Sequence, residues 1–217
     1  MNRKLLCPSL MCADLTELRK EVADLSAAGC DIFHCDIMDG SFVPNMALGL
    51  ADVAAVRKLT DRPVDVHLMM DSPAEKVDWF LDVGADIIYI HPEAERFPGK
   101  VLRHIREAGA FAGIAVSPDI SLEHIKELIP ICDYIMVMTV YPGFAGQKFV
   151  ESTKTKIRRL AEMKAEYGFQ LMIDGACSYE VIREMSEAGV DGFVLGTSAL
   201  FGKEKPYETI MKEIRAL

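Results

Sequence analysis

Two histidines and two aspartates interrupt segments that are otherwise apolar and rich in strand-forming residues. His34 and Asp36 lie in Phe-His-Cys-Asp-Ile-Met, His67 lies in Asp-Val-His-Leu-Met, and Asp174 closes Leu-Met-Ile-Asp. Side chains alternate along a strand, so His34, Asp36 and Met38 share one face. A buried carboxylate without a partner is costly, which favours a cation beside it. Two imidazoles and two carboxylates that converge would form a four-ligand site for Zn²⁺, Mn²⁺ or Fe²⁺.

The histidines also have a purely structural explanation. A single histidine in an apolar strand is more often a hydrogen-bonded core residue than a metal ligand, and only the second such strand favours a site. Asp39 and His91 are weaker candidates. Asp39 precedes Gly40 and fits a plain turn, while His91 precedes Pro92 and fits the cap of a loop.

Three glycine-containing segments late in the chain form a second group of candidates. Glycine lets backbone N–H groups approach an anion, and barrels frequently bind phosphate in the loops after their last strands. One such loop is more often a turn, but three in succession favour a phosphate site. The residues concerned are Gly143, Phe144, Ala145, Gly146, Gly175, Ala176, Gly196, Thr197 and Ser198.

Strands that alternate with helices are needed to position these residues. A Gly-x-Asp tripeptide begins at Gly29, Gly84 and Gly189, each time where a helix would end and a strand begin. These spacings are about two and four lengths of a unit of roughly 26 residues, so eight units fill the chain. Strands are predicted at residues 5–10, 32–37, 64–69, 87–91, 112–117, 134–139, 169–173 and 192–195.

The pattern predicts an α/β fold in which residues 1–217 form a single (β/α)₈ TIM barrel domain. No G-x-G-x-x-G follows the first predicted strand, which disfavours an open dinucleotide-binding sheet. In a TIM barrel the active site forms at the carboxyl ends of the strands, where the candidate side chains fall. Twelve methionines are mostly core filler, but Met38, Met69 and Met138 lie at these strand ends. There they are expected to cap the active site against water.

Composition limits the possible partners. The net charge of −9 and the lack of Lys and Arg clusters disfavour a nucleic-acid surface, whereas a small anionic substrate stays compatible. The apolar runs are far shorter than a membrane span, and the first ten residues do not resemble a signal peptide. The six cysteines lack CxxC spacing. We therefore expect a soluble cytoplasmic protein with reduced thiols and no membrane partner.

Six ordered motifs resemble the ribulose-phosphate 3-epimerase family over nearly the whole chain: PSLMCADL, FHCDIMDGSFVPN, DVHLM, MTVYPGFAGQKF, MIDGA and VLGTSALF. The resemblance implies a ribulose-phosphate-binding barrel with one divalent metal ion bound by His34, Asp36, His67 and Asp174. The ion could be Zn, Mn, Fe, Co or Mg. It further implies that Asp36 and Asp174 are the catalytic acid and base, that Ser9 and His67 contact the substrate, and that the three glycine loops bind its phosphate. Barrels of this kind often self-associate, so a homo-oligomer is expected.

Three differences from the usual family pattern indicate a branch. This chain has GFAGQ at residues 143–147 where the family usually has GFGGQ, alanine at Ala176 where it has glycine, and Gly-Thr-Ser at residues 196–198 where it has a shorter Gly-Ser. Together with SLMC near the start, these features resemble D-allulose-6-phosphate 3-epimerases. The sequence therefore favours interconversion of D-allulose 6-phosphate and D-fructose 6-phosphate. The alternative is interconversion of D-ribulose 5-phosphate and D-xylulose 5-phosphate in the pentose phosphate pathway.

Inversion at carbon 3 of a ketose requires proton removal from one face and proton return to the other, which suits two aspartates and a metal ion. A rival aldolase or decarboxylase on a similar barrel needs a lysine at a strand end, and no predicted strand has an interior lysine. A non-catalytic sugar-phosphate-binding barrel stays a distant alternative. It would not exchange the substrate C3 proton with D₂O.

Overall fold

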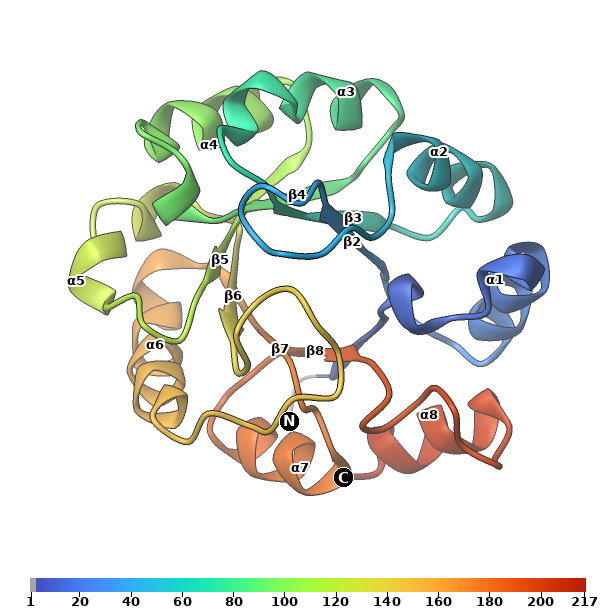
Figure 1. Cartoon of the computed structure of the whole chain (residues 1–217). Helices are drawn as coiled ribbons and strands as arrows, with labels where there is room; N and C mark the ends of the chain where they lie inside the picture. The colour runs from blue at the N-terminus through green and yellow to red at the C-terminus, as the bar shows by residue number, and fades with distance from the viewer. Residues whose placement is uncertain (1–2) are drawn as a thin grey trace.

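A computed structural model describes residues 3–217 of the protein, and its centre is a ring of eight parallel strands surrounded by helices (Figure 1). Along the sheet the hydrogen-bonded order is β1-β8-β7-β6-β5-β4-β3-β2, and a parallel bridge between Ser9 and His34 brings β1 beside β2. The predicted (β/α)₈ barrel fold is confirmed. The strands are β1 (Leu5–Pro8), β2 (Phe33–Met38), β3 (Val64–Met69), β4 (Ile87–Ile90), β5 (Phe111–Val116), β6 (Tyr134–Met138), β7 (Gln170–Asp174) and β8 (Gly192–Leu195).

One α-helix follows each strand along the chain. Short 3₁₀ turns precede or follow some of them: η1 (Leu10–Cys12), η2 (Leu15–Glu17), η3 (Pro73–Glu75), η4 (Pro92–Ala94) and η5 (Ile129–Ile131). None of the helices in residues 3–217 combines the length and the apolar character that a membrane crossing needs. The α-helices are α1 (Leu18–Ala27), α2 (Leu50–Leu59), α3 (Val77–Asp82), α4 (Pro98–Glu107), α5 (Leu122–Ile125), α6 (Thr153–Tyr167), α7 (Tyr179–Glu187) and α8 (Tyr207–Arg215).

Every predicted strand is present, with small shifts at the ends. The first strand ends at Pro8 and not at Leu10, because the chain turns into η1. The fourth ends at Ile90, because the proline after His91 begins η4. Asp174 is the last residue of β7. These boundaries place Asp174 at the carboxyl end of β7, Ser9 and His91 just beyond the ends of β1 and β4, and His34, Asp36 and His67 within β2 and β3.

The Gly-x-Asp repeat has a structural role at the opposite, amino-terminal end of the barrel. Each glycine has a positive φ, 85° at Gly29 for example, and lets the chain leave the preceding helix. The aspartate of the tripeptide accepts a hydrogen bond from a backbone N–H of the preceding strand. In the first copy, Leu6 N–H donates to Asp31 Oδ2 at 2.8 Å. Asp86, Asp133 and Asp191 repeat this bond with Val64, Ala112 and Leu171.

A basic side chain pairs with each of these four aspartates, which lie before β2, β4, β6 and β8. The pairs are Arg215–Asp31 at 2.7 Å, Arg57–Asp86 at 2.7 Å, Arg106–Asp133 at 3.6 Å and Lys164–Asp191 at 2.5 Å. Asp133 lacks the preceding glycine, so the sequence repeat showed only three of the four. The repeat therefore marks pairs of strands tied together at the amino end.

Two apolar layers hold the barrel. The larger lies between the strands and the helices, and the smaller fills the interior with side chains such as Cys7, Tyr89, Met136 and Met172. Interior filling leaves no pore, as is usual for eight-stranded barrels. The interior therefore forms a solid floor beneath the carboxyl ends of the strands.

Candidate active site

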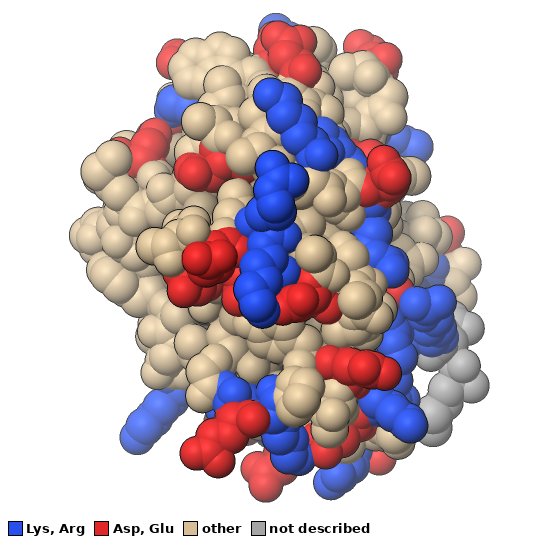
Figure 2. Space-filling model, turned by 90° about the vertical axis from the view of Figure 1, so that its right-hand side faces the viewer, with Lys and Arg blue, Asp and Glu red and all other residues tan. Residues whose placement is uncertain are grey.

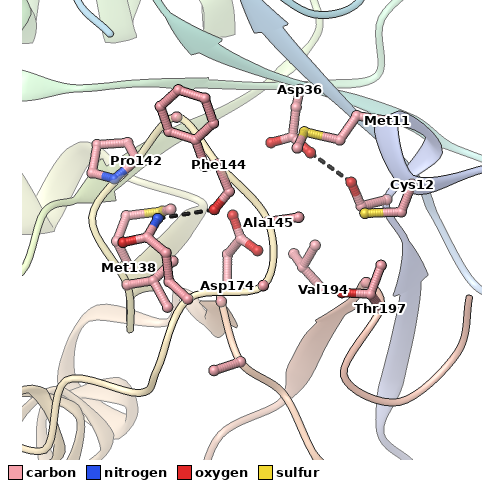
Figure 3. Close-up of a pocket in the computed structure, with 18 of the residues that line it drawn as sticks. Met11, Cys12, Asp36, Met138, Pro142, Phe144, Ala145, Asp174, Val194 and Thr197 are labelled. Atoms are coloured by element: carbon pink, nitrogen blue, oxygen red, sulfur yellow. Dashed lines mark hydrogen bonds between the residues drawn. The ribbon is translucent and has the colours of Figure 1, made fainter. Parts of the chain in front are cut away.

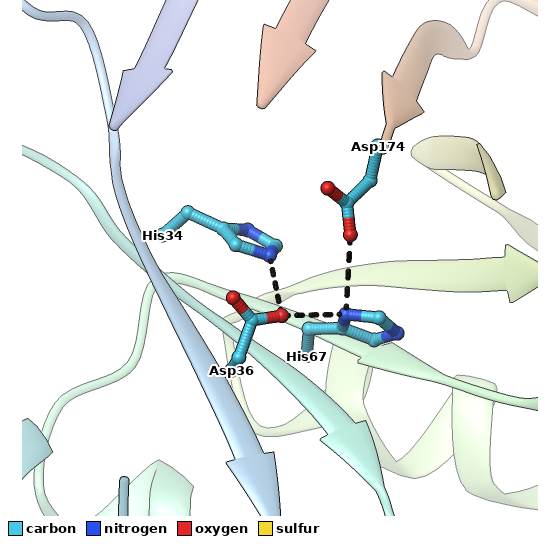
Figure 4. Close-up of side chains that lie close together, drawn as sticks. All are labelled: His34, Asp36, His67 and Asp174. Atoms are coloured by element: carbon cyan, nitrogen blue, oxygen red, sulfur yellow. Dashed lines mark hydrogen bonds and ion pairs between the residues drawn. The ribbon is translucent and has the colours of Figure 1, made fainter. Parts of the chain in front are cut away.

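The parallel register of β2 and β3 brings three of the four predicted ligands together. Asp36 on β2 stands opposite His67 on β3, and His34 stands opposite Asp65. Side chains two residues apart along a strand share a face, as do paired residues of neighbouring parallel strands. His34, Asp36 and His67 therefore point into the barrel together. Asp174, at the end of β7, reaches the same place from another part of the ring (Figure 4). The structure thus brings together all four residues predicted to bind a metal.

One donor atom from each of the four side chains lies within 4.8 Å of every other. Asp36 Oδ1 is 3.2 Å from His34 Nε2 and 3.1 Å from His67 Nδ1, and His67 Nδ1 is 3.8 Å from Asp174 Oδ2 (Figure 4). His34 and His67 are fully buried, while the Asp174 side chain is 16% exposed. The cluster is thus enclosed on the histidine side and open at Asp174.

The donor set fits a divalent cation. Metal–ligand distances of about 2.1 Å in a tetrahedral site put neighbouring ligand atoms roughly 3.4 Å apart, close to the separations found here. Two imidazole nitrogens and two carboxylate oxygens suit Zn²⁺, Mn²⁺ or Fe²⁺. The four side chains could therefore hold one divalent ion.

The two aspartates differ in proton affinity. Burial opposes ionisation of Asp36, but its contacts with His34 and His67 outweigh burial and lower the pKa of its carboxyl well below the usual value. Burial, together with the negative charge of Asp36, raises the pKa of Asp174 to about 7. Before a cation binds, the pair thus consists of an ionised carboxylate and a carboxyl that keeps its proton to near neutrality. This separation is typical of acid and base partners.

The two histidines also differ. Burial opposes the protonation of His34, but the carboxylates of Asp65 and Asp36 outweigh burial and raise its pKa well above the usual value. Burial lowers the pKa of His67 to about 4. His67 is therefore neutral near pH 7, as a metal ligand must be.

A pocket opens above the two aspartates at the carboxyl ends of the strands. Asp36 and Asp174 enter it from different strands, and Phe144 and Ala145 lie on the loop that borders it (Figure 3). Ser9 also lines it, and its Oγ donates to Asp36 Oδ2 at 2.6 Å. Every residue predicted to contact substrate lines this pocket except His67, which lies buried beneath it. The predicted members are Ser9, Gly143, Phe144, Ala145, Gly146, Gly175, Ala176, Gly196, Thr197 and Ser198.

The loops after β7 and β8 form one side of the pocket. In the part of the chain that the structure describes, the N–H groups of Ala176, Gly196 and Ser198 have no protein acceptor. Gly175 and Ala176 both have a positive φ, 106° and 47°. A positive φ is unusual for an alanine. Among the described residues, neither lysine nor arginine lines the pocket. An anion bound there would therefore be held by uncharged donors, such as these backbone N–H groups and the hydroxyls of Thr197 and Ser198.

The loops after β2 and β6 meet over the barrel mouth (Figure 1). Asn45 Nδ2 donates to the Gly143 carbonyl oxygen at 2.6 Å. Met38 and Met69 pack with Val43 from the first of these loops, and both line the pocket. Met138 lines it from the end of β6. The three methionines predicted as a cap are thus placed around the aspartates.

The two weaker candidates have different outcomes. Asp39 accepts from Ser41 N–H at 3.0 Å and pairs with Lys76 at 3.3 Å, so it is a turn residue. His91 is fully buried, and its Nε2 lies 2.8 Å from His67 Nε2. His91 therefore belongs to the site, which the sequence alone had left doubtful.

Several pocket and supporting residues were missed by the sequence analysis. Met11, Cys12 and Gln147 line the pocket. All three fall within the family motifs PSLMCADL and MTVYPGFAGQKF, which were the signal that could have found them. Asp65, on β3 beside His67, lies under the site, with its Oδ1 2.6 Å from His34 Nδ1. Glu93 lies 3.3 Å from His91 Nδ1. The only sequence signal for Glu93 was its position two residues after His91, just beyond β4.

One face of the outer surface carries side chains of both charges. On the face shown in Figure 2, basic side chains lie beside acidic ones. Lys20 and Asp24, 2.5 Å apart on α1, are one exposed ion pair of the protein. Mixed charge of this kind favours solubility over nucleic-acid binding.

Comparison with known proteins gives the family. Residues 5–201 match the ribulose-phosphate 3 epimerase family. The ribulose-phosphate 3-epimerase of Mycobacterium tuberculosis strain H37Rv is 40% identical over 204 residues, which cover 93% of this chain and 88% of that protein. The Bacillus subtilis ribulose-phosphate 3-epimerase is 37% identical over 213 residues, which cover 97% of each chain.

Solved structures share the fold at low identity. A structure of KGPDC from Streptococcus mutans has a TM-score of 0.76 at 15% identity, over 98% of this chain and 97% of that one. A 3-keto-L-gulonate-6-phosphate decarboxylase from Vibrio cholerae has a TM-score of 0.74 at 15% identity, over 99% and 98%. The sequence relatives, and not these folds, decide the activity class. The chain belongs to the ribulose-phosphate 3-epimerase family, and is accordingly an isomerase that acts on carbohydrates.

Proposed function

We propose that the protein is a metal-dependent 3-epimerase that interconverts D-ribulose 5-phosphate and D-xylulose 5-phosphate. The observation that carries the proposal is the meeting of Asp36 and Asp174, from β2 and β7, in one pocket beside two buried histidines. Inversion of one carbon needs a base on one face and an acid on the other, and two carboxyls from separate strands supply both.

Asp36 and Asp174 act as the proton-transfer pair in this proposal. One carboxylate takes the proton from carbon 3, and the other carboxyl returns a proton to the opposite face. Because the reverse reaction uses the same pair with the roles exchanged, each aspartate serves both directions. The Ser9 hydroxyl, which donates to Asp36, would hold that carboxylate in place and contact the substrate.

His34, Asp36, His67 and Asp174 would hold the divalent ion, and its positive charge would stabilise the negative charge that develops on the substrate oxygens. The phosphate would bind at the N–H groups of Ala176, Gly196 and Ser198, and at the loop after β6. Binding energy from this remote group positions the reacting carbon. Met38, Met69 and Met138 would keep water away from it.

The substrate assignment differs from the one that the sequence analysis favoured. The residues at 145, 176 and 196–198 resemble the hexulose-phosphate branch, which supports D-allulose 6-phosphate. The curated relatives at 37–40% identity are named ribulose-phosphate 3-epimerases, which supports the pentulose phosphate. Identity over nearly the full chain outweighs three loop positions, so we propose D-ribulose 5-phosphate.

The test is a kinetic comparison of the two substrates on metal-analysed protein. We expect kcat/KM for D-ribulose 5-phosphate to exceed that for D-allulose 6-phosphate at least tenfold. The reverse preference would assign the hexulose branch. Removal of the ion with a chelator should abolish turnover, and adding back Zn²⁺, Mn²⁺, Fe²⁺, Co²⁺ or Mg²⁺ singly identifies the active ion.

A non-catalytic sugar-phosphate-binding barrel predicts a different result in D₂O. Our proposal requires deuterium to enter carbon 3 of the substrate at a rate comparable to turnover. Absence of exchange with the ion bound would favour the binding protein. We further propose that residues 1–217 act as one domain and form a homo-oligomer, which light scattering of the purified protein would measure.

A further inference from the structure

A chain of buried polar groups leads away from the metal-binding cluster through His67. His67 Nδ1 faces the cluster, while its Nε2 lies 2.8 Å from His91 Nε2. His91 Nδ1 in turn lies 3.3 Å from Glu93 Oε1 and 3.2 Å from Ser117 Oγ. His67 and His91 are fully buried, so the ordering of their protons is set by protein groups and not by bulk water.

The contact between the two histidines needs one proton. Two ring nitrogens 2.8 Å apart form a hydrogen bond only if one is protonated and the other bears a lone pair. The direction of this bond therefore decides whether His67 Nδ1 bears a lone pair. A ring nitrogen binds a metal only through its lone pair.

Glu93 determines which of the two histidines donates the hydrogen bond between them. The Ser117 hydroxyl donates to Glu93 Oε1, and Glu93 Oε2 is buried without a partner in the described part of the chain. Burial raises the pKa of Glu93, but the bonds from His91 and Ser117 outweigh burial and lower it. An ionised carboxylate only accepts, so His91 Nδ1 must carry its proton. The His91 tautomer with its proton on Nδ1 has its lone pair on Nε2 and accepts from His67 Nε2–H.

We propose that His91 and Glu93 are positioning residues that hold His67 in its Nε2–H tautomer, with the Nδ1 lone pair directed at the divalent ion. The inference rests on the proposed metal site. Phe42 packs over His91 with ring centroids 4.7 Å apart, and Lys156 Nζ donates to the carbonyl oxygen of Ser117 at 2.8 Å. These contacts fix the plane of His91 and the position of Ser117, and thereby the orientation of His67.

The other histidine is supported over a shorter path. Asp65 Oδ1 lies 2.6 Å from His34 Nδ1, which leaves His34 Nε2 to face the cluster. Both ligands thus have a carboxylate behind them, one in direct contact and one through a second imidazole. Groups that orient a metal-bound histidine in this way typically change metal affinity by about 10- to 100-fold when they are removed.

The first test measures Zn²⁺ affinity by competition with a chromophoric chelator, in His91→Phe, His91→Gln and Glu93→Gln variants. His91→Phe removes the acceptor, so we expect the Kd to rise about 10- to 100-fold. His91→Gln places a carbonyl oxygen near the position of Nε2, so affinity should recover to within about threefold of wild type. Glu93→Gln should weaken binding about tenfold. Glu95→Gln is the matched control and should leave the Kd unchanged, because among residues 3–217 the Glu95 carboxylate accepts only from the backbone N–H groups of Ala74 and Phe97.

The second test reads the tautomer directly. In ¹⁵N spectra of the Zn²⁺-loaded wild-type protein, His67 should carry its proton on Nε2, and His91 should carry its proton on Nδ1. A proton on His67 Nδ1, or His91→Phe and Glu93→Gln affinities equal to that of Glu95→Gln, would overturn the proposal. Wild-type protein that binds no divalent ion would instead refute the metal site itself, so the two failures are distinguishable.

Discussion

Aspartates at the two ends of the barrel lie in different environments. At the amino end, Asp31, Asp86, Asp133 and Asp191 each accept a backbone N–H and pair with an arginine or lysine. At the carboxyl end, Asp36 and Asp174 have histidines and each other as neighbours. A carboxylate paired with a fixed cation is satisfied and stabilises the fold. Among the described residues, Asp36 and Asp174 have no such cation beside them, which leaves them available for the metal binding and proton transfer that we propose.

The comparison teaches that residue type alone does not identify a catalytic aspartate. All six lie within two residues of a strand end, and they differ in the charge that faces them. Substitution at one end should therefore damage chemistry, and substitution at the other should damage stability.

Asp174→Asn should produce the largest effect. Loss of one of the two proton-transfer groups is expected to lower kcat by about 10³-fold or more, while the free energy of unfolding stays near that of wild type. A coupled epimerase assay measures the rate, and urea denaturation measures the stability. Turnover near the wild-type rate would remove Asp174 from the mechanism.

Asp191→Asn should give the opposite pattern. The variant keeps the bond from Leu171 N–H but loses the charge that pairs with Lys164. Because Asp191 is 8% exposed, we expect a loss of about 2 kcal/mol in the free energy of unfolding, with kcat/KM within about twofold. Asp61→Asn, at an exposed position, is the control. If Asp191→Asn lost activity while its free energy of unfolding stayed unchanged, the proposed difference between the two ends of the barrel would be wrong.

The affinity of the cluster at the carboxyl end for a divalent ion should depend on pH, and the aspartates at the amino end should not affect this dependence. In the ion-free protein the pKa of Asp174 is raised to about 7 and that of His34 is also raised, so metal binding must displace protons below neutral pH. The apparent Kd should therefore increase by about tenfold or more per pH unit below 7. Calorimetry at pH 6 in buffers of different ionisation enthalpy should show proton release, which Asp191→Asn leaves unchanged. Affinity that is constant from pH 5.5 to 8 would contradict the assigned protonation.

Ala176→Gly should produce the smallest effect and tests the phosphate side of the mouth. Ala176 has a φ of 47°, which a glycine adopts without the penalty of a Cβ. We expect the free energy of unfolding to change by no more than about 1 kcal/mol, and KM to change by less than about threefold, because the backbone N–H stays in place. A KM that rises more than tenfold would show that the alanine side chain itself contacts the substrate.

The sequence by itself determined the barrel and most of its site. Strand alternation, the Gly-x-Asp repeat and the polar residues at strand ends depend on local periodicity and turn chemistry, which a chain carries in its own residue order. The prediction of His34, Asp36, His67 and Asp174 as one cluster followed from that order together with the family resemblance. The small errors at Leu10 and His91 arose where 3₁₀ turns end the strands.

Only the tertiary structure decided which neighbours each polar residue has. The pairing of β2 with β3, the approach of β7 and the closure by Ser9 and His34 place Asp65 behind one histidine and His91 behind the other. Such contacts join residues that are tens of positions apart, and each depends on register and on side-chain direction. The charge that faces a carboxylate, and therefore its role, is a property of the folded barrel and cannot be read from the residue's own surroundings in the chain.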